Sequence, residues 1–400
     1  MRPLSVDDMR PEELAQWRRE WMLPSDVTYL NHGSFGPSPW IVHRTRKGWM
    51  DKLEQQPMDF LIRRFEGHLD HSLERMAKFL GTKPNNLIWV DNATFAMNIV
   101  TASMKLQPGD EVLLTDHEYG AVQRIWRAAC QKAGAKMVMA KMPVLLDSTD
   151  EMIDSLFSSV TDKTKLIVVS HVTSPTAIIF PVQEICRRAK ALGIRVCIDG
   201  PHAIAMLPLN LNELGCDYYA ASCHKWLCGP FGTGFLYVHP KWHGEMVSPI
   251  VSWGKSLGGN PPSWKDEFQW MGTRDPSAFL SVPTAIEFLE EFGIDRFRQY
   301  GHNLAQYTRE QILSLSNNSP LSIDSPTWYG TMTSVPLPDS VQPTSHPGLL
   351  HPLQQKLWDD YKIEVLLTTF RERVYIRVSC YVYNTREQID YLVNAIKAST

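Results

Sequence analysis

The sequence of 400 residues lacks most of what marks a membrane, secreted or nucleic-acid-binding protein. No apolar run approaches the length that spans a bilayer, and the N-terminus has no continuous apolar stretch, so we expect neither a membrane protein nor a signal peptide. The formal net charge is only -3, with Lys and Arg scattered, which argues against a nucleic-acid partner. Seven cysteines without regular spacing favour a reduced, cytoplasmic compartment.

The cysteines also lack the paired spacing that is typical of structural zinc sites. Cys216, Cys223, His224 and Cys228 lie close together in the chain, but no Cys-x₂-Cys pair occurs among them. We therefore predict no metal site. The glycine-rich run at 229–234 leads into a strand rather than a helix, so it does not meet the requirements of a dinucleotide-binding loop.

What the sequence does contain is an alternation of short apolar strands and amphipathic helices. The pattern predicts strands at 111–115, 137–140, 166–171, 195–199 and 218–222, with helices at 95–106, 120–133, 150–159 and 182–192 between them. Apolar strands separated by helices are typical of a parallel sheet that is buried on both faces. We therefore predict an α/β fold with a doubly wound sheet.

The length predicts more than one domain, because one hydrophobic core rarely serves 400 residues. We assign residues 26–275 to a large α/β domain and residues 276–400 to a smaller α+β domain. Within the latter, helices at 277–291 and 295–315 precede a Pro- and Ser-rich loop at 319–352, then two strands and a last helix. Residues 1–25, with a helix at 11–22, form an arm that we expect to pack on the small domain.

Polar residues gather where the predicted strands end, which is where open α/β sheets carry their functional groups. Asp199 ends one strand, and Lys225 follows the next. Pyridoxal 5′-phosphate (PLP) requires a lysine amine to hold its aldehyde and a carboxylate to keep its pyridine nitrogen protonated. Either residue alone would more often be a surface group. Together at strand ends they favour a PLP site.

The segment Asp91-Asn92-Ala93-Thr94 precedes a predicted helix. The N–H groups at a helix N-terminus suit a phosphate, and the Thr hydroxyl adds a donor. The same pattern is equally typical of an ordinary N-cap, so the motif by itself leaves both interpretations open.

Longer motifs carry a resemblance to a known family. The run ASCHKWLCGP at 221–230, followed by GTGF at 232–235, resembles the lysine motif of class V aminotransferases, which are fold type I PLP enzymes related to cysteine desulfurases. Four further motifs look most like the isopenicillin N epimerase-like branch: NHGSFG at 31–36, HVTSPT at 171–176, GTRDP at 272–276 and YNT at 383–385. The resemblance implies the fold type I architecture, PLP as cofactor and a homodimer with a shared active site.

The resemblance also implies individual roles. Lys225 would form the Schiff base, Asp199 would pair with the pyridinium, and Tyr119 would stack on the ring, with His117 as the alternative. The remaining implied cofactor contacts are His202 near the ring, Ser174, a phosphate cradle of Ala93, Thr94, Ser222 and His224, and Thr273 reaching the phosphate of the neighbouring protomer. The implied substrate contacts are Asn31, His32 and Arg377.

Arg377 can be judged from its own strand as well. Alternation places Val374, Ile376 and Val378 on one face and Arg377 on the other, where an ordinary strand arginine would be exposed. The family has an arginine here for the substrate α-carboxylate, a ligand that suits the planar guanidinium fork. We therefore expect an amino-acid substrate with a free carboxylate.

Several reactions begin with loss of the Cα proton to Lys225 acting as general base. Reprotonation on the other face gives an epimerase or racemase, which is the reaction we predict first. Expulsion of a Cβ substituent gives a C–S lyase, protonation of the cofactor gives an aminotransferase, and a non-catalytic dimeric relative is a further alternative. A persulfide-forming desulfurase is disfavoured, because the stretch at 368–373 holds no cysteine and Cys380 follows Arg377 on the apolar face.

Overall fold

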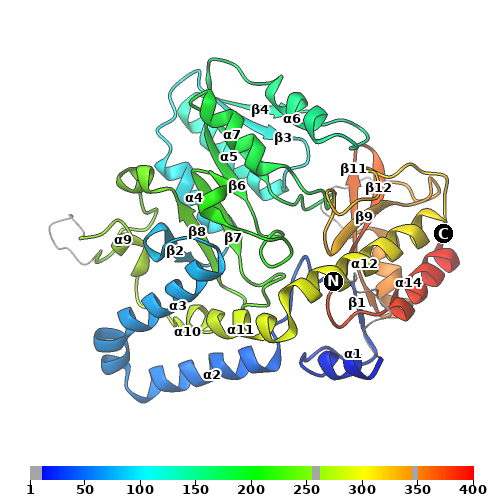
Figure 1. Ribbon diagram of the computed structural model, residues 1–400, viewed down its shortest axis with the longest axis horizontal. Helices are drawn as coiled ribbons and strands as arrows, with labels where there is room; N and C mark the ends of the chain where they lie inside the picture. Colours follow the sequence, from blue (N-terminus) through cyan, green and yellow to red (C-terminus); the bar gives the residue numbers. More distant parts are fainter. Residues whose placement is uncertain (1–10, 255–261, 345–349) are drawn as a thin grey trace.

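The computed structural model describes residues 11–254, 262–344 and 350–400. A seven-stranded sheet forms its centre, in the order β2-β8-β7-β6-β5-β3-β4 (Figure 1). All neighbouring strands are parallel except β8, which is antiparallel to both β7 and β2. The predicted α/β sheet is therefore confirmed. The strands are β2 (Leu87–Val90), β3 (Glu111–Thr115), β4 (Lys136–Ala140), β5 (Thr164–Ser170), β6 (Arg195–Asp199), β7 (Tyr218–Ser222) and β8 (Gly234–Val238).

Helices cover both faces of this sheet, as its continuous apolar strands require. Val112 and Leu114 of β3 pack in one cluster with α4 and α5, whereas Leu113 packs in a second cluster with α7 on the other face. The covering helices are α4 (Ala93–Ser103), α5 (Gly120–Ala133), α6 (Thr149–Phe157), α7 (Val182–Ala191) and the short α8 (Leu211–Leu214).

A second, three-stranded antiparallel sheet lies beside the first, with α12 and α14 close by (Figure 1). Its order is β11-β12-β9, so β12 is central. We predicted a loop throughout 319–352, and this is wrong for β9, whose five residues are all buried and pair with β12. These elements are α12 (Ile294–Leu313), β9 (Met332–Pro336), α13 (Pro352–Tyr361), β11 (Leu366–Phe370), β12 (Arg373–Ser379) and α14 (Arg386–Ser399).

The N-terminal segment packs on aromatic residues of a later helix. Helix α1 (Pro11–Arg18) is shorter than predicted, and the Trp17 ring meets Phe292 edge-on at 4.8 Å between ring centroids. Next, β1 (Thr28–Tyr29) pairs in parallel with β10 (Ile363–Glu364). This pairing joins the segment before α2 to the C-terminal part of the chain.

The remaining helices include α2 and α3, against which α10 and α11 pack. The helical region before residue 80 is interrupted near Pro57, and a π-helical stretch begins at Asp59. Helices α10 and α11, which we assigned to the small domain, pack against α2 and α3, and the three-part division of the chain stays a proposal. Among the described helices, none is long and apolar enough to cross a bilayer. These elements are α2 (Trp40–Gln55), η2 (Asp59–Arg64), α3 (Phe65–Phe79), η3 (Pro84–Asn86), η4 (Pro240–Glu245), α9 (Asp266–Gln269), α10 (Ser277–Leu280) and α11 (Val282–Phe292).

Candidate active site

Lys225 and Asp199 lie at the same edge of the central sheet. Asp199 is the last residue of β6 and pairs with Ala220 of the parallel strand β7, which ends at Ser222, three residues before Lys225. The Asp199 side chain is buried and makes no hydrogen bond to the residues that the structure describes. The Lys225 Nζ atom lies 2.9 Å from His202 Nε2, which follows β6. The structure thus brings Lys225, Asp199 and His202 together.

The environment of this trio favours its neutral forms. Burial, and after it the positive charge of Arg377, lower the pKa of the Lys225 amine to about 7, against the opposing effect of Asp199. Burial raises the pKa of Asp199 to about 6, and the Lys225 charge opposes this shift. Burial and the charge of Lys225 hold the pKa of His202 well below its ordinary value. His202 is therefore neutral at pH 7.

The hydrogen bonds of His202 agree with a neutral Lys225. Trp226 Nε1–H, which can only donate, points at His202 Nδ1 at 3.4 Å, so we assign the single imidazole hydrogen to Nε2. Nε2–H then donates to Lys225 Nζ, and an amine accepts a hydrogen bond only through a free lone pair. A lysine held with its lone pair free is a nucleophile and a base.

A loop before α2 passes close to the Lys225 backbone. The Gly36 N–H donates to His224 O at 2.9 Å, and a Cβ atom on Gly36 would lie 2.8 Å from the carbonyl oxygens of His224 and Lys225, so only glycine fits. His32, which we predicted as a substrate contact, is engaged through both ring nitrogens: Nδ1 with Tyr383 Oη at 2.7 Å and Nε2 with Lys225 O at 3.0 Å. Neither nitrogen is left for a ligand, so His32 supports the Lys225 backbone instead.

Asn31, the other substrate contact predicted in this loop, lies beside Glu364. Its Nδ2 donates to Glu364 Oε1 at 3.2 Å, whereas its buried Oδ1 has no partner among the described residues.

The N-terminus of α4 meets the end of β7. The Ala93 N–H donates to Ser222 Oγ at 2.9 Å, and Asn92 caps the helix by accepting from Phe95 N–H. The buried Nδ1 of His224 has no partner among the described residues. Ala93 and Ser222 therefore lie together at this helix end, and a phosphate contact of His224 stays a prediction. Thr94 is exposed at the same helix end.

Arg377 lies on β12 and is buried, so it is not an ordinary exposed strand arginine. Its Nη1 donates to both the carbonyl and the Oγ of Ser174, at 2.7 and 3.0 Å, and its Nη2 donates to Ser34 Oγ at 2.6 Å. The buried Nε–H has no partner among the described residues. Since a guanidinium has five N–H donors, Nε–H and one Nη2 hydrogen remain for a ligand. This pair of donors fits a carboxylate.

Comparison with known proteins identifies the group to which these features belong. The family model for aminotransferase class-V matches residues 61–392. The chain belongs to this family. It is 34% identical to an isopenicillin N epimerase of Amycolatopsis lactamdurans over 96% of this chain and 98% of that protein. It is 27% identical to a probable chloroplastic L-cysteine desulfhydrase of Arabidopsis thaliana, over 93% and 82% respectively.

A solved structure supports the fold alone. The apo cysteine desulfurase of Thermococcus onnurineus has 21% identical residues and a TM-score of 0.82, with 98% of both chains covered. The architecture is therefore that of the fold type I PLP-dependent enzymes, as the sequence motifs indicated.

Two candidates for the ring-stacking residue of a class V enzyme differ in exposure. Tyr119 precedes α5 and is 49% exposed, whereas His117 is 1% exposed, with Nδ1 held by Thr176 Oγ1 at 2.7 Å. The ring of Tyr119 is open to solvent, whereas the imidazole of His117 is enclosed. Tyr119 also lies close enough to Arg377 to affect the pKa of that guanidinium. These observations favour Tyr119 over His117 as the ring-stacking residue.

The predicted roles of Ser174 and Thr273 are less directly supported. We had predicted a cofactor contact for Ser174, and the structure brings this residue to Arg377 instead. Thr273 is exposed, and the next residue, Arg274, donates to Asp91 at 2.7 Å, just before α4. A contact of Thr273 with a neighbouring protomer stays a prediction.

Sequence reasoning missed two residues of this site. One is Ser34, the partner of Arg377 described above. The other is Glu118, which is buried and accepts from Thr115 Oγ1 and Ser170 Oγ, both at 2.6 Å. Burial raises the pKa of Glu118 to about 8, and the charge of Asp199 adds to the shift. An acidic residue three positions beyond an apolar strand, between His117 and Tyr119, was the available signal for Glu118.

The cysteines give information on the reaction. All seven are free and buried, and burial raises the pKa of every thiol. The thiolate is the nucleophilic form of cysteine. The structure therefore presents no accessible, activated thiol in this class V chain.

Proposed function

We propose that the protein binds PLP through Lys225 and acts at the α-carbon of an amino acid as an epimerase or racemase. The observation that carries this proposal is the buried Lys225 amine, 2.9 Å from a neutral His202 and beside Asp199. Similarity to isopenicillin N epimerases over nearly the whole chain supports the choice of reaction.

The unpartnered groups of the site fit the parts of this cofactor and substrate. The Asp199 carboxylate suits the pyridine nitrogen, the α4 N-terminus with Ser222 and His224 suits the phosphate, and the free edge of Arg377 suits the α-carboxylate. Asn31 Oδ1 is an additional acceptor near this loop. When bound, PLP supplies a ring that accepts electron density from Cα.

The chain's own residues then handle the proton. The low pKa of Lys225 keeps its amine able to take a proton from Cα near neutral pH, where a general base is most effective. Arg377 and Ser34 orient the substrate through its carboxylate, and His202 holds the Lys225 nitrogen in place. Inversion also requires a proton donor on the opposite face of Cα.

The reaction is tested by following amino acids in deuterium oxide. The wild-type enzyme should incorporate deuterium at Cα and lose optical purity, without forming pyruvate or ammonia, as measured by mass spectrometry and chiral chromatography. No deuterium uptake at Cα with any amino acid tested would contradict the proposal.

A C–S lyase is the second candidate, because L-cysteine desulfhydrases of Arabidopsis and rice are among the relatives, at 27–28% identity. β-Elimination requires no protein thiol, which agrees with seven buried cysteines. Release of pyruvate and ammonia from a cysteine derivative would favour this reaction over epimerisation, since an epimerase forms neither.

The pH dependence of cofactor loading tests the lysine directly. Only the neutral amine attacks an aldehyde, so with a pKa of about 7 the rate of loading should rise between about pH 6 and pH 8 and then level off. An ordinary lysine would instead give a rate that climbs until about pH 10. The measurement is the growth of visible absorbance after PLP is added to cofactor-free protein, and a climb that continues to pH 10 would contradict the assignment.

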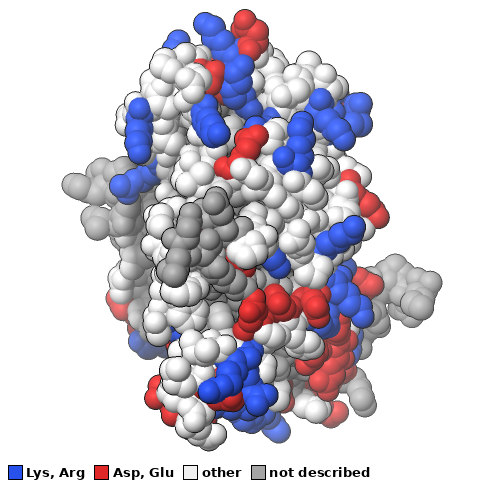
Figure 2. Space-filling view, turned by 90° about the vertical axis from the view of Figure 1, so that its left-hand side faces the viewer, with Lys and Arg blue, Asp and Glu red and all other residues white. Residues whose placement is uncertain are grey.

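We also propose a homodimer that shares the active site. Figure 2 shows Lys, Arg, Asp and Glu side chains along the upper, right and lower parts of one face. Large apolar residues are exposed on the segment that leads out of the central sheet, namely Val247, Ile250, Val251 and Trp253. A second copy would cover such residues and bring Thr273 to the neighbouring site. Light scattering distinguishes this dimer from a monomer.

A further inference from the structure

The hairpin of β11 and β12 ends in a strained turn. Phe370 pairs with Arg373, so the turn consists of Arg371 and Glu372 alone. Their φ angles are 46° and 63°, in the left-handed region that usually requires Gly, Asn or Asp in such two-residue turns. Neither residue is of that kind. A conformation of this sort persists only where surrounding contacts hold it.

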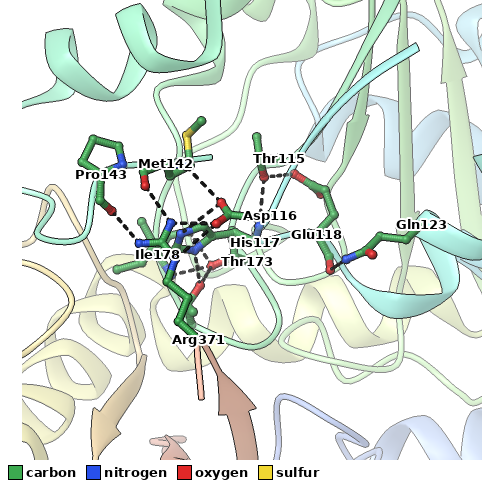
Figure 3. A network of polar contacts seen from close by, with 11 residues as sticks. Thr115, Asp116, His117, Glu118, Gln123, Met142, Pro143, Thr173, Ile178 and Arg371 are labelled. Atoms are coloured by element: carbon green, nitrogen blue, oxygen red, sulfur yellow. Dashed lines mark hydrogen bonds and ion pairs between the residues drawn. The ribbon is translucent and has the colours of Figure 1, made fainter. Parts of the chain in front are cut away.

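The Arg371 guanidinium supplies those contacts. Its Nε and Nη2 donate to Asp116 Oδ2 at 3.2 and 2.7 Å, Nη2 also donates to Met142 O at 2.6 Å, and Nη1 donates to Pro143 O at 3.3 Å (Figure 3). Asp116 follows β3, and Met142 follows β4. One side chain of the small sheet is therefore bound to two loops at the carboxyl edge of the central sheet.

Apolar packing and further hydrogen bonds continue this docking. The Phe370 ring lies 4.5 Å from the enclosed ring of His117. Further along the small sheet, Thr368 Oγ1 and Ser334 Oγ both donate to Pro175 O, at 3.2 and 3.0 Å. The loops after β3, β4 and β5 are thus all bound to the small sheet.

The docked sheet carries Arg377, and the loop that it docks on carries Tyr119. Arg377 lies four residues beyond Arg373 on β12, opposite Leu366 of β11. Asp116 lies three residues before Tyr119, whose closeness to Arg377 was noted above. A shift of the hairpin tip would therefore move the carboxylate arginine relative to the segment that bears Tyr119.

We propose that Arg371 is a positioning residue: its bonds to Asp116, Met142 and Pro143 fix the small sheet so that Arg377 stands at the correct place for a substrate carboxylate. The substrate part of this inference rests on the proposed function. The docking part concerns only the chain itself.

The experiment compares Arg371→Ala with Arg373→Ala, which removes the neighbouring arginine of the hairpin. Arg373 is a matched control, because the only ion pair that it forms among the described residues is a 3.9 Å contact with exposed Asp339. Two measurements are made: amide hydrogen exchange of residues 366–377 in cofactor-free protein, and kcat and KM of the loaded enzyme. Asp116→Asn serves as a second variant that removes the charge of the same ion pair from the other side. Arg371→Lys tests whether a lysine at position 371 restores the docking.

Arg371→Ala and Asp116→Asn should each speed exchange in the hairpin by about tenfold and raise KM by a similar factor, with kcat changed by less than about twofold. Arg373→Ala should change neither, and Arg371→Lys should restore part of the effect, since lysine keeps the charge but not the fork. The proposal is overturned if hairpin exchange in Arg371→Ala equals that of the wild type, or if Arg373→Ala has the same effect.

The two proposals can fail separately. If the wild-type enzyme exchanges no Cα hydrogen, the proposed function fails, while the amide-exchange comparison still decides the docking. If docking fails, the wild-type reaction is unaffected.

Discussion

Lys225→Ala should give a folded protein that loses the covalent link to PLP and nearly all turnover. In the proposed function Lys225 Nζ provides both the bond to the cofactor and the base, and its neighbours Asp199 and His202 cannot supply an amine. We expect a fall in kcat of about 10³-fold or more, since a positioned general base alone contributes about 10²–10⁴-fold. The measurement combines turnover with borohydride reduction and mass spectrometry of the peptide that contains residue 225.

The matched control is Lys190→Ala, which removes an exposed lysine from α7. Lys190→Ala should keep the reducible link and full activity. A Lys225→Ala protein that still turns over at a wild-type rate, or a reduced cofactor found on another lysine of the wild type, would refute the assignment of Lys225.

Arg377→Lys should lower kcat/KM by about 100-fold for substrates with a free α-carboxylate. Lysine retains a positive charge in this buried place but lacks the planar fork, so the pair of donors at Nε and Nη2 is lost. Breaking a buried hydrogen bond to a charged group typically costs about 2–5 kcal/mol, and the free energy that corresponds to a 100-fold fall in kcat/KM lies within this range. The measurement is steady-state kinetics on an amino acid and on its α-carboxamide.

Comparing the amino acid with its α-carboxamide distinguishes loss of carboxylate binding from a general loss of activity. Because the carboxamide carries no charge, its slower reaction should change by less than about threefold in Arg377→Lys. Arg373→Lys, on the same strand but partly exposed, is the control and should leave both substrates unaffected. Equal losses for the acid and the amide would contradict carboxylate binding by Arg377.

Much of the central sheet could be predicted from the sequence. The strands at 111–115, 195–199 and 218–222 and the helix at 120–133 have the predicted bounds, because their apolar periodicity is local and strong. Strand β9 was missed because its residues are flanked by Pro and Ser, and only pairing with β12 makes Met332–Pro336 a strand. The turn at Arg371 was missed for a similar reason, since contacts distant in sequence override its unfavourable backbone conformation.

The sequence by itself determined which strand ends meet at one edge of the sheet. Apolar strands end at Asp199 and just before Lys225, and neighbouring parallel strands must bring such ends to one edge of the sheet, so their proximity followed from pattern alone. Alternation along β12 likewise determined the face on which Arg377 lies.

Only the tertiary structure decided which partners complete the site. Ser34 binds Arg377 across 343 positions of sequence, and Asp116 binds Arg371 across 255. It also decided that His32 supports the Lys225 backbone instead of facing a ligand, and that Glu118 is buried. Hydrogen-bond partners and burial depend on how distant segments pack, and a local pattern of residue types holds no record of that packing.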